Sequence, residues 1–233
     1  MQLLSVLMAR SIWLIDIRDL NPRGRELRFT LFAELANKYD FSRYPYDRDD
    51  DEDDYFVTMP TEKEPGYKFI DGQFRKSNGE VITINLNIFD DGLVAETRSS
   101  TQDCDAFLEE VLQWAAQNHG IVYRPDMVRS KARVSELHVR PSHVLSNLNS
   151  QLARFAERLS SLVSISGGTI PFEVSGLTLA PDPTLNPRPS PFIFERAVGI
   201  PLSDNRFYTR APLDTDQHLE LLEELGIILQ GAS

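Results

Sequence analysis

The chain has few of the side chains that build metal centres and disulfides. It contains one cysteine, Cys104, and four histidines among 233 residues. A lone cysteine excludes an intramolecular disulfide and a cysteine-based zinc cage. His138 and His143 stand five residues apart with Pro141 between them, a spacing that suits neither a helical nor a strand metal pair. We therefore expect no metal and no other cofactor, and a reducing compartment such as the cytoplasm.

Long apolar runs and excess positive charge are also missing. The segment from Met1 to Met8 is apolar, but Arg10 interrupts it, so it reads as a strand or as an extension before a start at Met8. No run approaches the roughly 18 apolar residues of a membrane helix, so we expect no membrane association. The formal net charge of −11 repels nucleic-acid backbones and disfavours general binding to DNA or RNA.

No familiar catalytic signature is present. A nucleophile elbow, a phosphate-binding loop, a dinucleotide fingerprint and a cysteine–histidine pair are all absent from the sequence. Asp16 and Asp19 lie at the end of the apolar run Ser11–Ile17, where metal-dependent hydrolases and nucleases place a first carboxylate. Such a site needs a further convergent carboxylate, and the local spacing supplies none. Catalysis by these two residues is the alternative reading, and we lean towards a protein that is not an enzyme.

The apolar patterns predict an α+β fold, mainly antiparallel sheet with about four helices. Residues 67–75 and 81–89 alternate in polarity on either side of Asn78-Gly79, which favours a β-hairpin. Ser100 and Gly120 are suited to cap a helix between them. We expect a single compact unit over residues 1–233.

Two similar lobes within that unit are a second reading of the same pattern. Residues 67–120 and 170–229 each read as three strands followed by a capped helix. In each segment the third strand ends in Thr-Arg, at Thr97-Arg98 and at Thr209-Arg210. Only this dipeptide is shared, so duplication and coincidence both stay open.

Arg98 and Arg210 are candidate anion-binding residues, because each precedes a helix start where free N–H groups converge. The structural alternative is pairing with acids of the first helical turn. These acids are Asp103 or Asp105 for Arg98, and Asp214 or Asp216 for Arg210.

The most acidic segment lies in a long loop, residues 40–66. Seven acids fall between Asp47 and Asp54. As a calcium-binding EF-hand the run fails at three positions, which hold Glu52, Asp54 and Thr58. The expectation is a solvated, flexible loop, or a surface for a cationic partner formed by Asp49, Asp50, Asp51 and Asp53.

A row of basic residues is the other charged feature. Arg129, Lys131 and Arg133 share one face of an extended segment. The row suits a positively charged strand edge, phosphate contacts, or a counter-surface for the acidic loop of another copy.

The segment 144–163 predicts one amphipathic helix. Its apolar residues are spaced alternately three and four apart: Leu145, Leu148, Leu152, Phe155, Leu159 and Leu162. Packing on its own sheet is the simplest expectation, with Arg154 and Arg158 off the apolar stripe and facing a partner. The leading functional reading is a non-enzymatic cytoplasmic protein that binds a protein partner or its own copies, as a subunit or regulator of a larger assembly. An acidic antidote of the immunity type belongs to this class.

Overall fold

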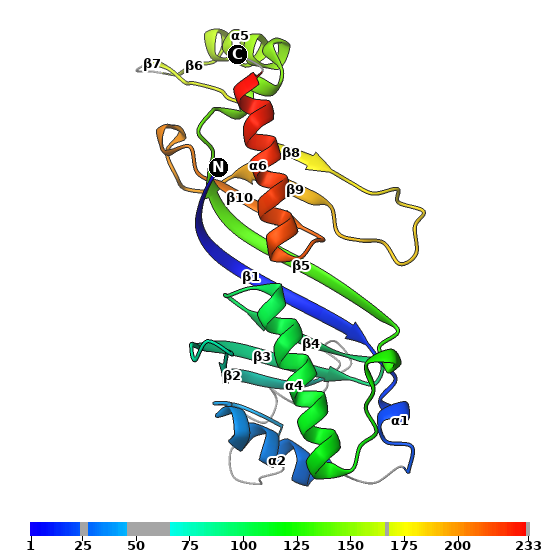
Figure 1. Ribbon diagram of the computed structural model, residues 1–233. Coiled ribbons are helices and arrows are strands. Elements are labelled where there is room, and N and C mark those ends of the chain that lie inside the picture. The colour runs from blue at the N-terminus through cyan, green and yellow to red at the C-terminus, as the bar shows by residue number, and fades with distance from the viewer. Residues whose placement is uncertain (24–27, 46–65, 166–167, 232–233) are drawn as a thin grey trace. The chain divides into compact units, whose positions relative to one another are not determined.

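The computed structural model describes residues 1–23, 28–45, 66–165 and 168–231. They form an α+β fold with an antiparallel sheet and five α-helices, as the sequence predicted (Figure 1). The chain divides into two compact units: unit 1 comprises residues 1–7 and 136–233, and unit 2 comprises residues 8–135. The long strands β1 (Gln2–Leu14) and β5 (Ser130–Arg140) contribute residues to both units.

Unit 2 consists of a three-stranded meander, the long strand β1 and helices packed on one core. Its strands follow the order β2-β3-β4-β1, and each neighbouring pair is antiparallel. Besides β1, its elements are α1 (Ile17–Leu20), α2 (Arg28–Tyr39), β2 (Tyr67–Arg75), β3 (Val81–Phe89), β4 (Gly92–Thr97) and α4 (Thr101–His119). Helix α2 packs against both β2 and α4.

The local signals that predicted unit 2 are confirmed. Ile82, Ile84 and Leu86 of β3 are buried, and the residues between them are not, as the alternation requires. The Ser100 hydroxyl accepts a hydrogen bond from the N–H of Asp103 (3.1 Å), and Gly120 ends α4 in the left-handed conformation. The buried residues of α4, which include Cys104, Phe107, Leu108, Val111 and Leu112, pack in the core of unit 2.

Unit 1 has a smaller core built from β5, a second meander and the C-terminal helix. Its strands follow the order β5-β10-β9-β8. The remaining elements are a 3-10 turn η2 (Leu145–Leu148), α5 (Ser150–Leu162), β6 (Ser164–Ile165), β7 (Gly168–Thr169), β8 (Gly176–Leu179), β9 (Phe192–Arg196), the 3-10 turn η3 (Leu202–Asp204), β10 (Phe207–Ala211) and α6 (Thr215–Gly231); a further 3-10 turn, η1 (Pro125–Met127), precedes β5. Leu222, Leu225 and Leu229 of α6 pack on Phe194 and Phe207 of the meander.

The segment 144–163 departs from the predicted single helix. It forms the turn η2 and then, after Asn149, the helix α5. The Asn149 side chain accepts hydrogen bonds from the N–H groups of Gln151 and Leu152, so it starts a new helix where the apolar spacing predicted continuity. Leu145 is buried but no residue of α5 is, so the expectation that this helix packs on its own sheet is wrong.

The two units follow a similar order of elements. Each has a long strand, a helical segment, a three-stranded meander and a capped helix, and the third meander strand neighbours the long strand. The burial pattern places Ala95 at the position of Thr209 and Thr97 at the position of Ala211. Counted from the helix caps Ser100 and Asp214, Thr97 likewise corresponds to Ala211, so the shared Thr-Arg dipeptide is two residues out of register in this alignment.

Candidate protein-interaction surface

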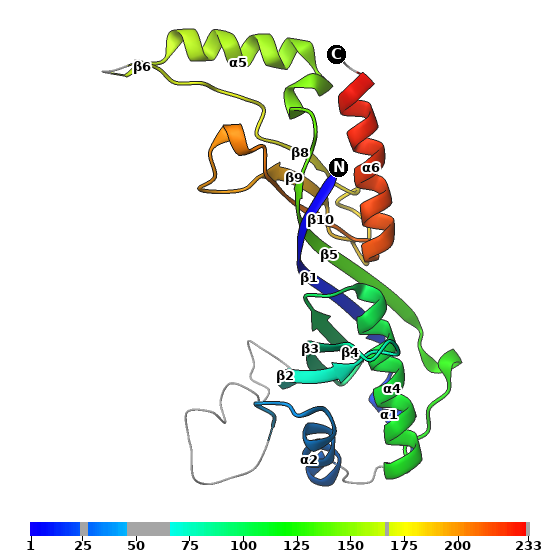
Figure 2. The same cartoon turned by 60° about the vertical axis from the view of Figure 1, so that its left-hand side comes forward.

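Helix α5 carries an apolar stripe that its own unit does not cover. Leu152, Phe155 and Leu162 are 50%, 67% and 62% exposed, and Leu159 on the same stripe is half-buried. Figure 2 shows the helix extending away from α6. Single exposed apolar residues are common on protein surfaces, but three large ones along one helical stripe form a patch of the kind that binds other proteins. We call these four residues the α5 stripe.

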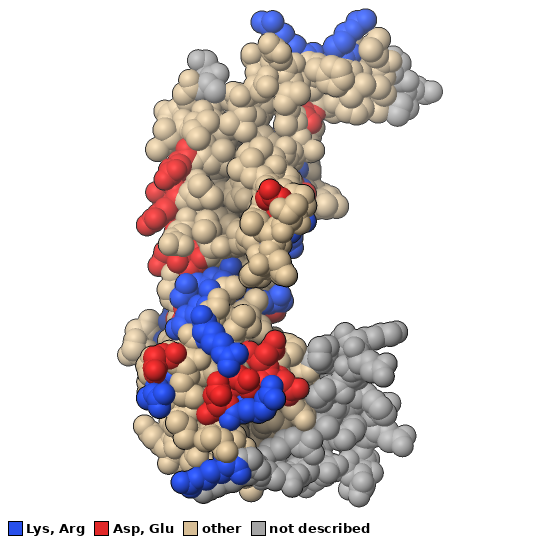
Figure 3. Space-filling model, turned by 90° about the vertical axis from the view of Figure 1, so that its right-hand side faces the viewer, with Lys and Arg blue, Asp and Glu red and all other residues tan. Residues whose placement is uncertain are grey.

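The two basic residues predicted for partner binding lie off this stripe. Arg154 and Arg158 are both exposed on α5, together with Glu157. At the top of unit 1, which is the height of α5 in Figure 1, Figure 3 shows mostly uncharged surface with basic groups along its upper edge. An apolar stripe beside positive charge suits an acidic and apolar counter-surface.

A second exposed patch lies on α6. The helix buries Leu222, Leu225 and Leu229 against the core of unit 1. Leu221, Glu224 and Ile228 occupy another face at spacings of three and four residues, and all three are exposed. We call these three residues the α6 face.

The aspartates proposed for the enzyme reading are engaged in structural contacts. Asp16 caps α1, and its carboxylate accepts a hydrogen bond from the N–H of Arg18 (2.9 Å), which holds the pKa of Asp16 below its usual value. Arg129 lies 3.0 Å from Asp19 and 3.7 Å from Asp16. Among the described residues, no group of three histidine, cysteine or acidic side chains is arranged to hold a metal ion.

The basic row on β5 is paired within unit 2. Besides the contact of Arg129 with Asp19, Lys131 sits 3.5 Å from the centroid of the Trp13 ring. Arg133 pairs with Asp105 at 2.6 Å. Acidic and basic side chains alternate over this surface in Figure 3. The row is therefore a set of internal contacts, and its charge is largely neutralised by its own unit.

Asp105 is a structural residue that the sequence did not reveal. Its carboxylate accepts hydrogen bonds from the buried hydroxyl of Ser11, from Trp13 Nε1 (2.8 Å) and from Arg133 (2.6 Å to Nη2). It thus connects α4 to β1 and β5. The only signal in the sequence was its position near the start of a predicted helix, which suggested a pair with Arg98 instead.

Asp103 and Asp105, the acids predicted to pair with Arg98, contact other basic residues. Asp103 lies 3.3 Å from Lys76, and Asp105 pairs with Arg133. Arg98 is exposed after β4, and Arg210 on β10 lies 3.8 Å from Glu136 of β5. For Arg210, a residue of the neighbouring strand therefore supplies a counter-charge.

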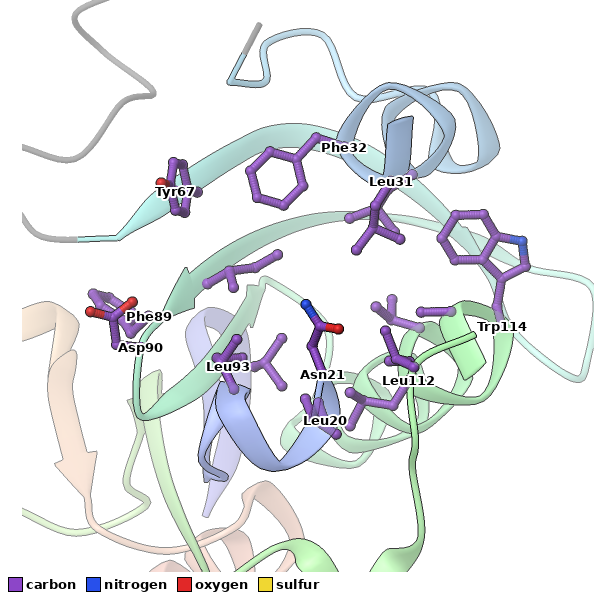
Figure 4. A pocket seen from close by; sticks show the side chains of 16 residues that line it. Leu20, Asn21, Leu31, Phe32, Tyr67, Phe89, Asp90, Leu93, Leu112 and Trp114 are labelled. Carbon is purple, nitrogen blue, oxygen red and sulfur yellow. The ribbon is translucent and has the colours of Figure 1, made fainter. Parts of the chain in front are cut away.

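An apolar cavity of about 250 Å³ lies inside unit 2, bounded by α1, α2, α4 and the ends of β3 and β4 (Figure 4). Leu20, Phe32, Leu93 and Leu112 point into it. Of its lining side chains, only Asn21 and Asp90 carry an amide or a carboxylate. Ligand sites combine apolar walls with several converging polar groups. This cavity is better described as space within one hydrophobic core.

Asp49, Asp50, Asp51 and Asp53, which were predicted to contact a cationic partner, lie outside the described residues. The same holds for the rest of the acid run. In the described ranges, no helix has the length and apolar character required to cross a membrane.

No family model matches the chain, and no curated protein sequence matches it.

Proposed function

We propose that this protein is a non-enzymatic binding protein, a subunit or regulator of a larger assembly, and that the α5 stripe is its docking surface. The observation that carries the proposal is the exposure of Leu152, Phe155 and Leu162 on one stripe of a capped helix. An amphipathic helix that presents its apolar residues to solvent gains free energy by burying them against a partner. A reducing compartment such as the cytoplasm suits the single buried cysteine, Cys104.

The contacts of the charged residues favour binding over catalysis. General acids and bases need access to a substrate and a pKa near the working pH. Asp16 and Asp19 are held by Arg129, and contacts with the N–H and side chain of Arg18 lower the pKa of Asp16 further from neutrality. Asp105 is occupied by three donors. These carboxylates stabilise the fold of unit 2. We therefore place the partner-binding surface in unit 1, on α5.

A pair of matched variants tests this proposal. Phe155→Glu places a charge in the α5 stripe, and Val198→Glu makes the same change at a turn of unit 1 where Val198 is 98% exposed. Affinity capture with the full-length wild-type chain and both variants is compared by mass spectrometry. We expect Phe155→Glu to lose the binding partner, because a buried unpaired charge is costly, and Val198→Glu to retain it.

Two outcomes contradict the proposal. One is capture of the same proteins by all three chains, which places recognition elsewhere. The other is hydrolysis of a phosphoester by the wild-type chain that Asp16→Asn abolishes, which supports the enzyme reading.

A further inference from the structure

Helices α2 and α5 share an apolar pattern, although one is packed and the other is not. Four positions match in order: Phe32 with Leu152, Leu35 with Phe155, Ala36 with Ala156, and Tyr39 with Leu159. Each helix also follows the same place in its unit, between the long strand and the meander. The four α2 residues are buried in the core of unit 2, whereas Leu152 and Phe155 are exposed. Unit 1 therefore contains the counterpart of α2 in an undocked position.

Helices α4 and α6 correspond residue by residue from their caps. Ser100 accepts from the N–H of Asp103, and Asp214 accepts from the N–H of Gln217, three residues on in each helix. From these caps the buried positions coincide: Thr101 with Thr215, Cys104 with His218, Leu108 with Leu222, Val111 with Leu225, and Ala115 with Leu229. The shared pattern fixes which positions of α6 correspond to the face of α4 that α2 covers.

The α6 face corresponds to the face of α4 that α2 covers in unit 2. In unit 2, Phe107 packs edge-on against Tyr39 with ring centroids 5.0 Å apart, and Glu110 accepts a hydrogen bond from the Tyr39 hydroxyl (3.0 Å). Trp114 lines the same cavity as Leu31 and Leu35 of α2. The counterparts of Phe107, Glu110 and Trp114 are Leu221, Glu224 and Ile228, which are all exposed. The α6 face is therefore equivalent to the surface of α4 on which α2 packs, which we call a helix seat. Among the described residues, no helix covers this seat in unit 1.

The ion pair that fastens α2 to α4 also has a counterpart. Lys38 lies 3.0 Å from Glu110 in unit 2. The corresponding residues are Arg158 on α5 and Glu224 on α6, which have opposite charges and are both exposed. The seat on α6 thus matches α5 in its apolar positions and in its charge.

The connections at its two ends hold α5 away from the α6 of its own chain. Residues 21–27 separate α1 from α2, but only Asn149 separates η2 from α5. The turn η2 is fixed to α6, because the Asn147 amide donates to the carbonyl of Leu229 (3.2 Å). Beyond the helix, the N–H of Phe172 donates to the Ser160 hydroxyl (2.8 Å). A short hinge that keeps an element from its own seat favours exchange of that element between copies.

We propose that two copies of this chain associate by exchanging α5, so that the α5 stripe of each copy docks on the α6 face of the other. This inference rests on the proposed function, since it names the first partner of the α5 stripe. Arg158 of one chain pairs with Glu224 of the second, and Leu152, Phe155 and Leu159 cover Leu221 and Ile228. Each copy gives its α5 to the other and receives one in return. The dimer therefore has two-fold symmetry, and both α5 stripes are covered.

Charge reversal tests the exchange on the full-length chain. Sedimentation equilibrium measures the dimer dissociation constant of the wild type, of Arg158→Glu, of Glu224→Arg and of the double variant. We expect each single reversal to raise that constant about tenfold and the double variant to restore it to within about threefold, because the pair is re-formed with opposite polarity. Arg188→Glu, an equal change at an exposed residue of unit 1, is the control and should leave the constant unchanged.

Three results overturn the exchange. A dimer that tolerates both single reversals shows an interface elsewhere. A wild-type chain that stays monomeric at every concentration shows no exchange; if capture by that chain still depends on Phe155, the partner is another protein and the proposed function stands. A monomer that captures nothing contradicts both proposals.

Discussion

At the scale of single residues, the buried polar groups of this protein support its fold. His218 is fully buried in α6, and its Nε2 lies 3.0 Å from the Thr209 hydroxyl on β10. Burial disfavours the charged imidazolium and lowers the pKa of His218 to about 4. The corresponding position in α4 holds Cys104, where burial raises the pKa of the thiol. Both side chains are therefore uncharged near neutral pH.

The depressed pKa of His218 predicts a loss of stability in acid. As pH falls below about 6.5, the unfolded chain protonates this histidine while the folded chain does not until about pH 4. Stability is thus fully present above pH 6.5 and declines by up to about 3 kcal/mol towards pH 4. Urea unfolding between pH 7 and pH 4 should show a steeper decline for the wild type than for His218→Gln. Parallel curves for the two proteins would contradict the assignment.

Asp105 is expected to be the most costly carboxylate to remove among those in the ion pairs of unit 2. Asp105→Ala leaves Arg133, Trp13 Nε1 and the Ser11 hydroxyl without their acceptor. We expect the free energy of unfolding to fall by about 2–4 kcal/mol. The control Asp126→Ala removes an exposed partner of Arg124 and should cost less than about 1 kcal/mol. Equal losses in urea unfolding would show that Asp105 is no more than a surface charge.

At the scale of elements, sequence patterns predicted what each segment forms better than what it packs against. The alternation in β3, the turn at Asn78-Gly79 and the caps of α4 all act through neighbouring residues, so they could be found in the sequence. The docking of α5 depends on residues far away in the chain. Apolar spacing shows which side of a helix is apolar, but it does not show whether anything covers that side.

The partners of the basic row and of the acids near helix starts could not be predicted from the sequence for the same reason. Arg133 and Asp105 are 28 residues apart, and Arg129 and Asp19 are 110 residues apart. Pairing over such distances depends on which strands become neighbours. The sequence showed the charges but not their partners. The acids near the helix start were therefore predicted to pair with Arg98, and the basic row was predicted to form a charged strand edge, to contact phosphates or to face another copy.

Matched truncations in α2 and α5 should have different effects. Leu35→Ala removes a buried side chain and should cost about 2–5 kcal/mol of unfolding free energy. Phe155→Ala, at the corresponding position of α5, should change the stability of the monomer by less than about 0.5 kcal/mol. Urea unfolding at low protein concentration makes the comparison. A large loss for Phe155→Ala in monomeric protein would mean that α5 packs on its own unit.

At the scale of the whole molecule, the two units differ mainly in how completely each covers its own helices. Unit 2 fills its seat with α2 and holds it with the pair Lys38–Glu110. Unit 1 exposes both the seat on α6 and the helix that matches it. A chain with a net charge of −11 repels its own copies at long range, so association requires a specific, complementary contact. The opposite charges of Arg158 and Glu224 provide such a complementary contact.

The most direct measurement is a covalent trap between two differently tagged chains. One carries Arg158→Cys and the other carries Glu224→Cys; the native Cys104 is buried and stays unreactive under mild oxidation. The account predicts a disulfide-linked heterodimer with twice the chain mass of 26.5 kDa, formed at low protein concentration and lost when Phe155→Glu is added to both chains. A further chain carries both introduced cysteines. The exchange would be contradicted if the two singly substituted chains form no cross-link while the doubly substituted chain forms a disulfide within itself. That result would show that α5 packs on the α6 of its own chain.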